Sequence, residues 1–241
     1  MSQTNNSQTG INGFIVLDKP LKMSSMKAIA ILRRKAGRAK TGHAGTLDPL
    51  ATGVLVCALG KATKSISKMM DTTKRYRTLV DLGAFTSTDD LEGEKERITP
   101  KEVPSLEILE NALTQFTGSF LQRPPAFSAM KVNGRRAYQL ARSGDEVILK
   151  PRPVMVHEMT LLRYEWPMVE LEMLVDKGFY VRSLARELGV SLGTGGHCTS
   201  IRRTAVGPFT LETACDPESL PDPLPTEFVL GIDDALALLG D

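Results

Sequence analysis

Short apolar runs separated by turn residues dominate the hydrophobic pattern of this 241-residue chain. Runs of this kind, either continuous or alternating with period two, are typical of β-strands. They predict strands over residues 13–18, 52–59, 76–82, 154–166, 169–176 and 199–206. The run at 52–59 is apolar almost throughout, which indicates a buried strand.

A second set of segments has helical spacing or helix-terminating residues. Ser24 and Ser25 can cap a helix that runs to about Lys35, and Gly37 ends it. Further helices are predicted over residues 61–70, 105–116, 180–192 and 232–239. Because strands outnumber helices and do not alternate strictly with them, the pattern predicts an α+β fold with a mixed, mainly antiparallel sheet and flanking helices.

Polar, Gly and Pro residues predict how the chain is divided. Residues 1–12 are polar and lack the apolar run of a signal peptide, so we expect a disordered tail. Residues 13–216 are expected to form one domain, because residues 217–241 offer only a Pro-rich linker and a short helix. Within the domain, Val132-Asn133-Gly134 is a hairpin turn signal.

Composition excludes several classes of protein. With no run of 18 apolar residues and only 20 Gly and 14 Pro, neither a membrane span nor a collagen-like chain fits. The three cysteines, Cys57, Cys198 and Cys215, form no C-x-x-C motif, which argues against both a disulfide framework and a zinc site. We therefore expect a cytoplasmic protein without a metal.

The charge is unevenly distributed, although its sum is only +2. Residues 19–42 hold eight Lys or Arg and no acidic residue, and residues 123–152 hold seven against two acidic residues. Residues 207–241 hold eight acidic residues and no basic one. Two basic surfaces favour a polyanion as partner, since Lys and Arg release counterions from phosphates. The alternative is that both runs are simply solvated surfaces.

The segment Thr41-Gly-His-Ala-Gly-Thr-Leu-Asp-Pro-Leu-Ala-Thr-Gly53 is the strongest candidate for chemistry. It places three glycines, His43 and the carboxylate of Asp48 directly before the predicted buried strand. Loops on a rigid strand often carry catalytic groups, and glycine lets a ligand approach the backbone. The alternative is that Asp48-Pro49 only starts a turn and that His43 makes a local contact.

This segment resembles the catalytic motif of the TruB family, the tRNA pseudouridine synthases that act on uridine 55 of the T arm. Further segments resemble the family in the same order, and the resemblance spans about residues 13–209. They are Gly13-Phe-Ile-Val-Leu-Asp-Lys-Pro20, Lys74-Arg-Tyr-Arg77, Pro125-Ala-Phe-Ser-Ala-Met-Lys131, Lys177-Gly-Phe-Tyr-Val-Arg-Ser-Leu184 and Ile201-Arg-Arg203. The resemblance implies the pseudouridine synthase catalytic fold, a monomer without cofactor or metal, and the T stem-loop of tRNA as partner.

The resemblance also assigns the catalytic group. Asp48 matches the catalytic aspartate, whose carboxylate can add to the ribose or to the base, or act as a base at the 2′ carbon. Asp18 is the competing carboxylate, and Cys57 is a less favoured alternative as a nucleophile that adds to uracil.

Other matches surround the target base, which the family flips into a cleft. Tyr76 matches the tyrosine that stacks on this base, and Tyr180 matches a tyrosine that lines the same pocket. Arg182 matches the arginine that pairs with the catalytic carboxylate, and Ile201 matches an apolar residue packed beneath the base.

The remaining matches concern RNA binding. His43 is expected to lie against flipped T-loop nucleotides, and residues 123–152 correspond to a basic, thumb-like insertion that grips the T arm. The candidate phosphate contacts are Lys19, Lys64, Arg135, Arg136, Arg202 and Arg203.

The chain departs from the family's usual pattern in a few places. Lys22 stands where glycine is usual, Phe179 where threonine is usual, and Ile201 where leucine is usual. The chain also ends about where the family's small RNA-binding PUA domain begins, so this domain is expected to be absent. Alternatives to the T-arm activity are an RNA-guided or mRNA-directed pseudouridine synthase, and an RNA-folding chaperone that acts without turnover.

Overall fold

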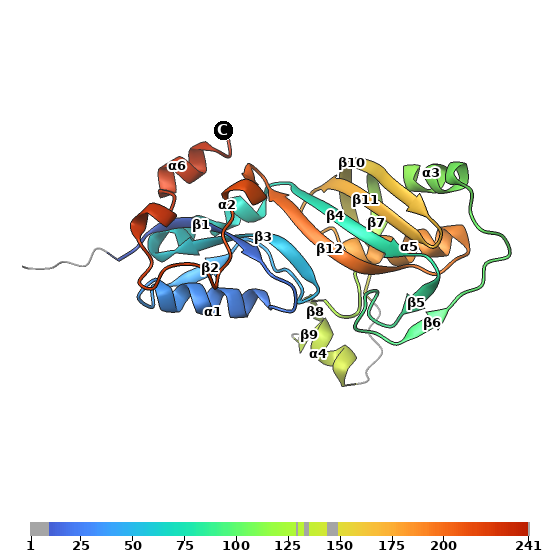
Figure 1. Ribbon diagram of the computed structural model, residues 1–241, viewed down its shortest axis with the longest axis horizontal. Helices are drawn as coiled ribbons and strands as arrows, with labels where there is room; N and C mark the ends of the chain where they lie inside the picture. Colours follow the sequence, from blue (N-terminus) through green and yellow to red (C-terminus); the bar gives the residue numbers. More distant parts are fainter. Residues whose placement is uncertain (1–9, 129, 133–134, 144–148, 241) are drawn as a thin grey trace, which may run out of the picture. The chain divides into compact units, whose positions relative to one another are not determined.

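The computed structural model describes residues 10–128, 130–132, 135–143 and 149–240. The chain forms two compact units (Figure 1). The first contains Met1–Thr72 and Ala205–Asp241, and the second contains Thr73–Thr204. Within the described residues, no helix is both long and apolar enough to cross a membrane.

An antiparallel pair of strands forms the centre of the first unit. β1 (Gly13–Lys19) pairs with β3 (Ala51–Leu59), from Gly13 opposite Leu59 to Lys19 opposite Gly53. Both strands confirm the sequence prediction. The short strand β2 (Thr41–His43) also pairs with β3, although a loop was predicted there. Its polar residues give no strand signal, and the pairing depends on β3.

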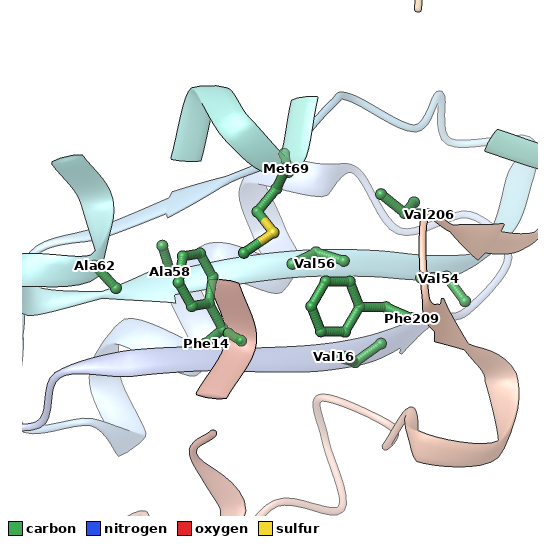
Figure 2. Close-up of a cluster of buried hydrophobic side chains, with 11 residues drawn as sticks. Phe14, Val16, Val54, Val56, Ala58, Ala62, Met69, Val206 and Phe209 are labelled. Atoms are coloured by element: carbon green, nitrogen blue, oxygen red, sulfur yellow. The ribbon is translucent and has the colours of Figure 1, made fainter. Parts of the chain in front are cut away.

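Three helices cover these strands. α1 (Ser25–Lys35) begins at Ser24, whose hydroxyl accepts a hydrogen bond from the Lys27 N–H, as predicted. The predicted helix at 61–70 is divided into a 3-10 helix, η1 (Gly60–Ser65), and α2 (Ile66–Met70). Together with α6 (Ile232–Ala237), α2 closes a buried cluster on one face of β1 and β3. Figure 2 shows its side chains, including Phe14, Val16, Val54, Val56, Met69, Val206 and Phe209.

The Pro-rich stretch predicted as a linker packs against α1. The Lys35 ammonium donates hydrogen bonds to the carbonyl oxygens of Glu218 and Leu220, and the Leu224 N–H donates to the Lys35 carbonyl at 2.8 Å. Leu220 and Leu224 are both 4% exposed. Downstream of them lies η3 (Thr226–Phe228), and upstream lie β13 (Phe209–Thr210) and η2 (Leu211–Thr213). The C-terminal segment is therefore part of the first unit's core.

A largely antiparallel sheet forms the second unit. Its strand order is β12-β4-β11-β10-β7. The bounds are β12 (His197–Val206), β4 (Lys74–Asp81), β11 (Met168–Val175), β10 (Arg152–Glu165) and β7 (Gly118–Gln122). β4, β11, β10 and β7 pair antiparallel, which confirms the predicted mainly antiparallel sheet.

Two helices pack on this sheet. α5 (Val181–Leu192) contacts β4 and α3 (Leu106–Thr114), and α3 contacts β10. α5 ends at Gly193, whose φ of 67° is a left-handed conformation that suits glycine. The predicted helices at 105–116 and 180–192 are thus confirmed, with slightly shorter ends.

Short elements complete the second unit. β5 (Ala84–Thr86) pairs with β6 (Lys95–Arg97). In the predicted thumb, β8 (Lys131–Val132) pairs with β9 (Arg135–Arg136), which confirms the hairpin, and α4 (Ala137–Arg142) follows. The turn residues Asn133 and Gly134 lie outside the described residues.

Candidate active site

Asp48 lies in the connection between β2 and β3, and its side chain is half-buried. The carbonyl oxygens of three consecutive residues of this connection each accept a hydrogen bond. Ser25 Oγ donates to Leu47 at 2.9 Å, the Ala51 N–H donates to Asp48 at 3.0 Å, and the Lys22 N–H donates to Pro49 at 2.9 Å. The Leu47 N–H also donates to Ser25 Oγ, at 2.8 Å. The backbone on both sides of Asp48 is therefore fixed.

Lys22, one of the departures from the family pattern, has a left-handed backbone with φ of 63°. This conformation strains a residue that carries a Cβ and suits glycine, which explains why glycine is usual at this position. The same residue donates its N–H to the loop that holds Asp48, so the turn contributes directly to the site.

Asp18 and Cys57, the two alternatives to Asp48 as the catalytic group, have different surroundings. Asp18 is half-buried on β1, opposite Val54, and its N–H donates to the Cys215 carbonyl at 2.9 Å. Cys57 is fully buried in β3, and its thiol donates to the Leu55 carbonyl at 3.4 Å. A fully buried thiol within a strand fits packing and not attack on a nucleotide.

The first basic segment divides into buried and exposed residues. Lys19, predicted as a phosphate contact, is 0% exposed, and its ammonium donates to the carbonyl of Met23 at 2.6 Å and of Pro20 at 3.0 Å. The ammonium therefore holds a turn, and the phosphate contact of Lys19 stays a prediction. Lys35 is also buried. The exposed basic residues of the segment are Lys22, Lys27, Arg33, Arg34, Arg38 and Lys40.

In the second unit, Arg182 lies at the start of α5 and its side chain is 6% exposed. Its guanidinium donates to the Thr88 carbonyl at 3.0 Å, to Asp90 Oδ2 at 3.3 Å and to the Phe127 carbonyl at 2.9 Å. Asp90 is 3% exposed. The Arg182 guanidinium therefore joins α5 to two separate loops, one at residues 88–90 and one at Phe127. The predicted pairing of Arg182 with Asp48 stays a prediction.

One helical turn later, Arg186 forms an ion pair with Asp89. Asp89 is 7% exposed and has a φ of 61°. Burial raises the pKa of Asp89 from 3.8 to about 6, although the charges of Arg186 and Arg182 lower it. Neither Asp89 nor Asp90 is among the site residues predicted from the sequence.

The predicted base-binding residues of this unit belong to β4, α5 and β12. Thr78 Oγ1 lies 3.7 Å from Cys198 Sγ, which lies 3.6 Å from the Val181 carbonyl, so the start of α5 covers this face of β4. Tyr76 is two residues from Thr78 and points to the same face, because side chains alternate along a strand. Tyr76 is half-buried, and Ile201 is 6% exposed on β12.

Tyr180 is positioned by a residue that the sequence did not reveal. Gln122, at the end of β7, accepts a hydrogen bond from the Tyr180 N–H at 2.9 Å and donates to the Tyr180 carbonyl at 3.1 Å. Gln122 is 1% exposed. No local pattern in the sequence indicated this contact, because it joins residues 58 positions apart. The neighbouring departure, Phe179, packs edge-on against Phe120, with ring centres 6.5 Å apart.

The predicted thumb begins at Arg123, whose backbone is held by three side chains of α5. The Arg123 N–H donates to Glu187 at 3.1 Å, and the Arg123 carbonyl accepts from Ser183 and Arg186, each at 2.8 Å. α5 therefore carries Arg182 and also holds the start of the predicted thumb.

The other predicted RNA contacts vary in exposure. Lys64 is exposed, whereas His43 and Arg202 are half-buried. Arg203 is 2% exposed, and its phosphate contact stays a prediction. Arg135 and Arg136 are described by their backbone only, in β9.

Comparisons with known proteins identify the family. The family model described as "TruB family pseudouridylate synthase (N terminal domain)" matches residues 33–181. A tRNA pseudouridine synthase B of Rhodopseudomonas palustris is 47% identical over 200 residues, which cover 83% of this chain and 54% of that protein. One of Phocaeicola vulgatus is 44% identical over 214 residues, with 86% of this chain and 91% of that protein covered.

Solved structures agree with the sequence matches. A chain in the crystal structure of a Cbf5-Nop10-Gar1 complex superposes with a TM-score of 0.72 at 28% identity, which covers 94% of this chain and 62% of that chain. This chain thus spans about half of the Rhodopseudomonas protein but most of the Phocaeicola protein. Because the family model matches more than half of this chain's residues, the chain belongs to the TruB family of pseudouridylate synthases.

Proposed function

We propose that this chain converts uridine to pseudouridine in tRNA, at position 55 in the T arm, with Asp48 as the catalytic residue. One observation carries the assignment of Asp48. It lies within the segment that resembles the family's catalytic motif, and the carbonyl oxygens of Leu47, Asp48 and Pro49 are all held by hydrogen bonds. A group fixed in this way needs little reorganisation during the reaction.

A carboxylate can perform this isomerisation without any further reagent. The N1–C1′ bond breaks, the base turns, and a C5–C1′ bond forms; C5 loses a proton and N1 gains one. The formula of the nucleotide is unchanged, so the balance requires no oxidant, reductant or energy source. Asp48 supplies a nucleophile or a base for this exchange.

The second unit supplies the residues that bind the target uridine. Tyr76 offers an aromatic face for stacking and a hydroxyl on the face of β4 that α5 covers. Tyr180, held by Gln122, and Arg182, held between two loops, are further parts of this pocket, with Ile201 as its apolar wall. The exposed basic residues of α1 and of the thumb contact RNA phosphates.

The test measures release of tritium from [5-³H]uridine in a tRNA transcript, because the C5 proton is lost in the product. We expect Asp48→Asn and Asp48→Ala to abolish release and to keep tRNA binding within a few-fold of the wild type, since the carboxylate acts mainly in the transition state. Asp18→Asn is the matched control and should retain release. Turnover of Asp48→Ala within tenfold of the wild type would overturn the assignment.

Three RNAs separate the alternatives. A full tRNA transcript and an isolated T stem-loop should both release tritium, whereas an unrelated hairpin of the same length should not. Release from the hairpin would favour a broader or guided specificity. Binding of tRNA without any release by the wild-type chain would favour an RNA-folding chaperone.

A further inference from the structure

We propose that Ser25 is a positioning residue for the catalytic carboxylate, because its hydroxyl fixes the residue immediately before Asp48. The inference rests on the proposed role of Asp48 and assigns a function to a side chain outside the motif at residues 42–53. Ser25 is the first residue of α1 and is 2% exposed.

The Ser25 hydroxyl uses both of its hydrogen-bonding roles on one residue. It donates to the Leu47 carbonyl at 2.9 Å and accepts from the Leu47 N–H at 2.8 Å. A hydroxyl is the smallest side-chain group that can donate and accept at once. Leu47 is 3% exposed, so water cannot readily replace these bonds. The Leu47 carbonyl belongs to the peptide bond that leads into Asp48, and the hydroxyl therefore sets the plane of that bond.

A second anchor from the same short segment holds the other side. The Lys22 N–H donates to the Pro49 carbonyl at 2.9 Å. The turn that presents this N–H is itself held by the buried Lys19 ammonium, which donates to the carbonyls of Pro20 and Met23. Residues 22–25 thus fix the backbone on both sides of Asp48, with Ser25 acting through its side chain and Lys22 through its backbone N–H.

The neighbouring serine provides a matched control. Ser24 caps α1 by accepting a hydrogen bond from the Lys27 N–H at 3.1 Å, and it is exposed. Ser24→Ala removes one hydroxyl and weakens the same helix, but it leaves Leu47 untouched. A difference in rate between the two alanine variants therefore arises from the loss of the contact with Leu47 and not from the weakening of α1.

The experiment compares wild type, Ser24→Ala, Ser25→Ala and Ser25→Cys. Cysteine is somewhat larger than serine and fills the site, but its thiol is a weak donor and acceptor, so this variant is used if the alanine variant does not fold. We measure the single-turnover rate at saturating tRNA, the Kd for tRNA, and hydrogen exchange of the Leu47 amide. A displacement of a reacting group by about 1 Å can cost roughly 100-fold in rate.

We expect Ser25→Ala or Ser25→Cys to lower the single-turnover rate about 10- to 100-fold, to leave the Kd within about threefold, and to accelerate exchange of the Leu47 amide. Ser24→Ala should change none of the three by more than about twofold. Equal rates for the Ser24 and Ser25 variants, with Asp48→Ala inactive, would overturn the positioning role but leave the proposed function intact. An active Asp48→Ala would overturn both.

Discussion

The Asp48 loop and the start of α5 are held by opposite kinds of interaction. In the first unit, neutral hydrogen bonds from residues 22–25 hold residues 47–49. In the second unit, Arg182 and Arg186 hold Asp89, Asp90 and nearby carbonyls with charged groups. Neutral bonds are insensitive to pH and salt, whereas buried ion pairs depend on the protonation of their carboxylates. The two regions should therefore respond differently to the same perturbation.

The largest expected effect is on the buried ion pair of the second unit. Arg182→Met leaves the carboxylate of Asp90, whose side chain is 5% exposed, without its guanidinium, and should lower the free energy of unfolding by about 3 kcal/mol. Urea unfolding measures this loss. Arg77→Met, which breaks the exposed Arg77–Glu170 pair, is the control and should cost less than about 1 kcal/mol. Equal losses in the two variants would show that burial does not distinguish these pairs.

The second prediction concerns pH and Asp89. A carboxyl group whose pKa rises from 3.8 to about 6 on folding binds more protons in the folded state between these values. Its contribution to stability is therefore complete below pH 4 and is lost as the pH rises through 6. The difference in unfolding free energy between wild type and Asp89→Asn should fall by about 2 kcal/mol from pH 4 to pH 7. A difference in unfolding free energy that grows from pH 4 to pH 7 would contradict the predicted rise in the pKa of Asp89.

The sequence predicted the fold where the signals are local. The cap at Ser24, the buried strand predicted over 52–59 and the gap between the strands predicted over 154–166 and 169–176 each depend on adjacent residues, and the structure agrees. β2 was missed because its pairing depends on Leu59 and Cys57, which lie far along the chain.

The candidate site shows the same limit. Asp48, Tyr76 and Arg182 stand in recognisable motifs, but Ser25 and Gln122 act through backbone groups distant in sequence. A charge pattern also does not reveal burial: Lys19 and Arg203, both predicted as phosphate contacts, are 0% and 2% exposed.

A smaller effect on stability is expected at Lys22 in the first unit. Lys22→Gly removes the strain of a φ of 63° and should stabilise the protein by about 0.5 kcal/mol, while the N–H to Pro49 is kept. Arg38→Gly is a matched control, since Arg38 also has a φ of 63° but lies beyond the end of α1. Both should raise the melting temperature. Loss of stability in Lys22→Gly would show that the lysine side chain is needed there.

The smallest effect per residue is expected for the salt dependence of tRNA binding at the basic surfaces. Charge reversal of Arg135 and Arg136 should reduce the slope of log Kd for tRNA against log salt by about one to two units, since each phosphate contact contributes roughly 0.7 to 0.9. Reversal of the exposed Glu227 in the acidic C-terminal segment should leave the slope unchanged. A slope that depends on Glu227 and not on the two arginines would place the RNA on another surface.

The most direct test of the central claim maps pseudouridine by mass spectrometry in a tRNA transcript treated with wild type or Asp48→Asn. We expect pseudouridine at position 55 with the wild type, and none at that position with the variant. Pseudouridine at position 55 with Asp48→Asn, at a rate near that of the wild type, would contradict the assignment of Asp48 as the catalytic residue.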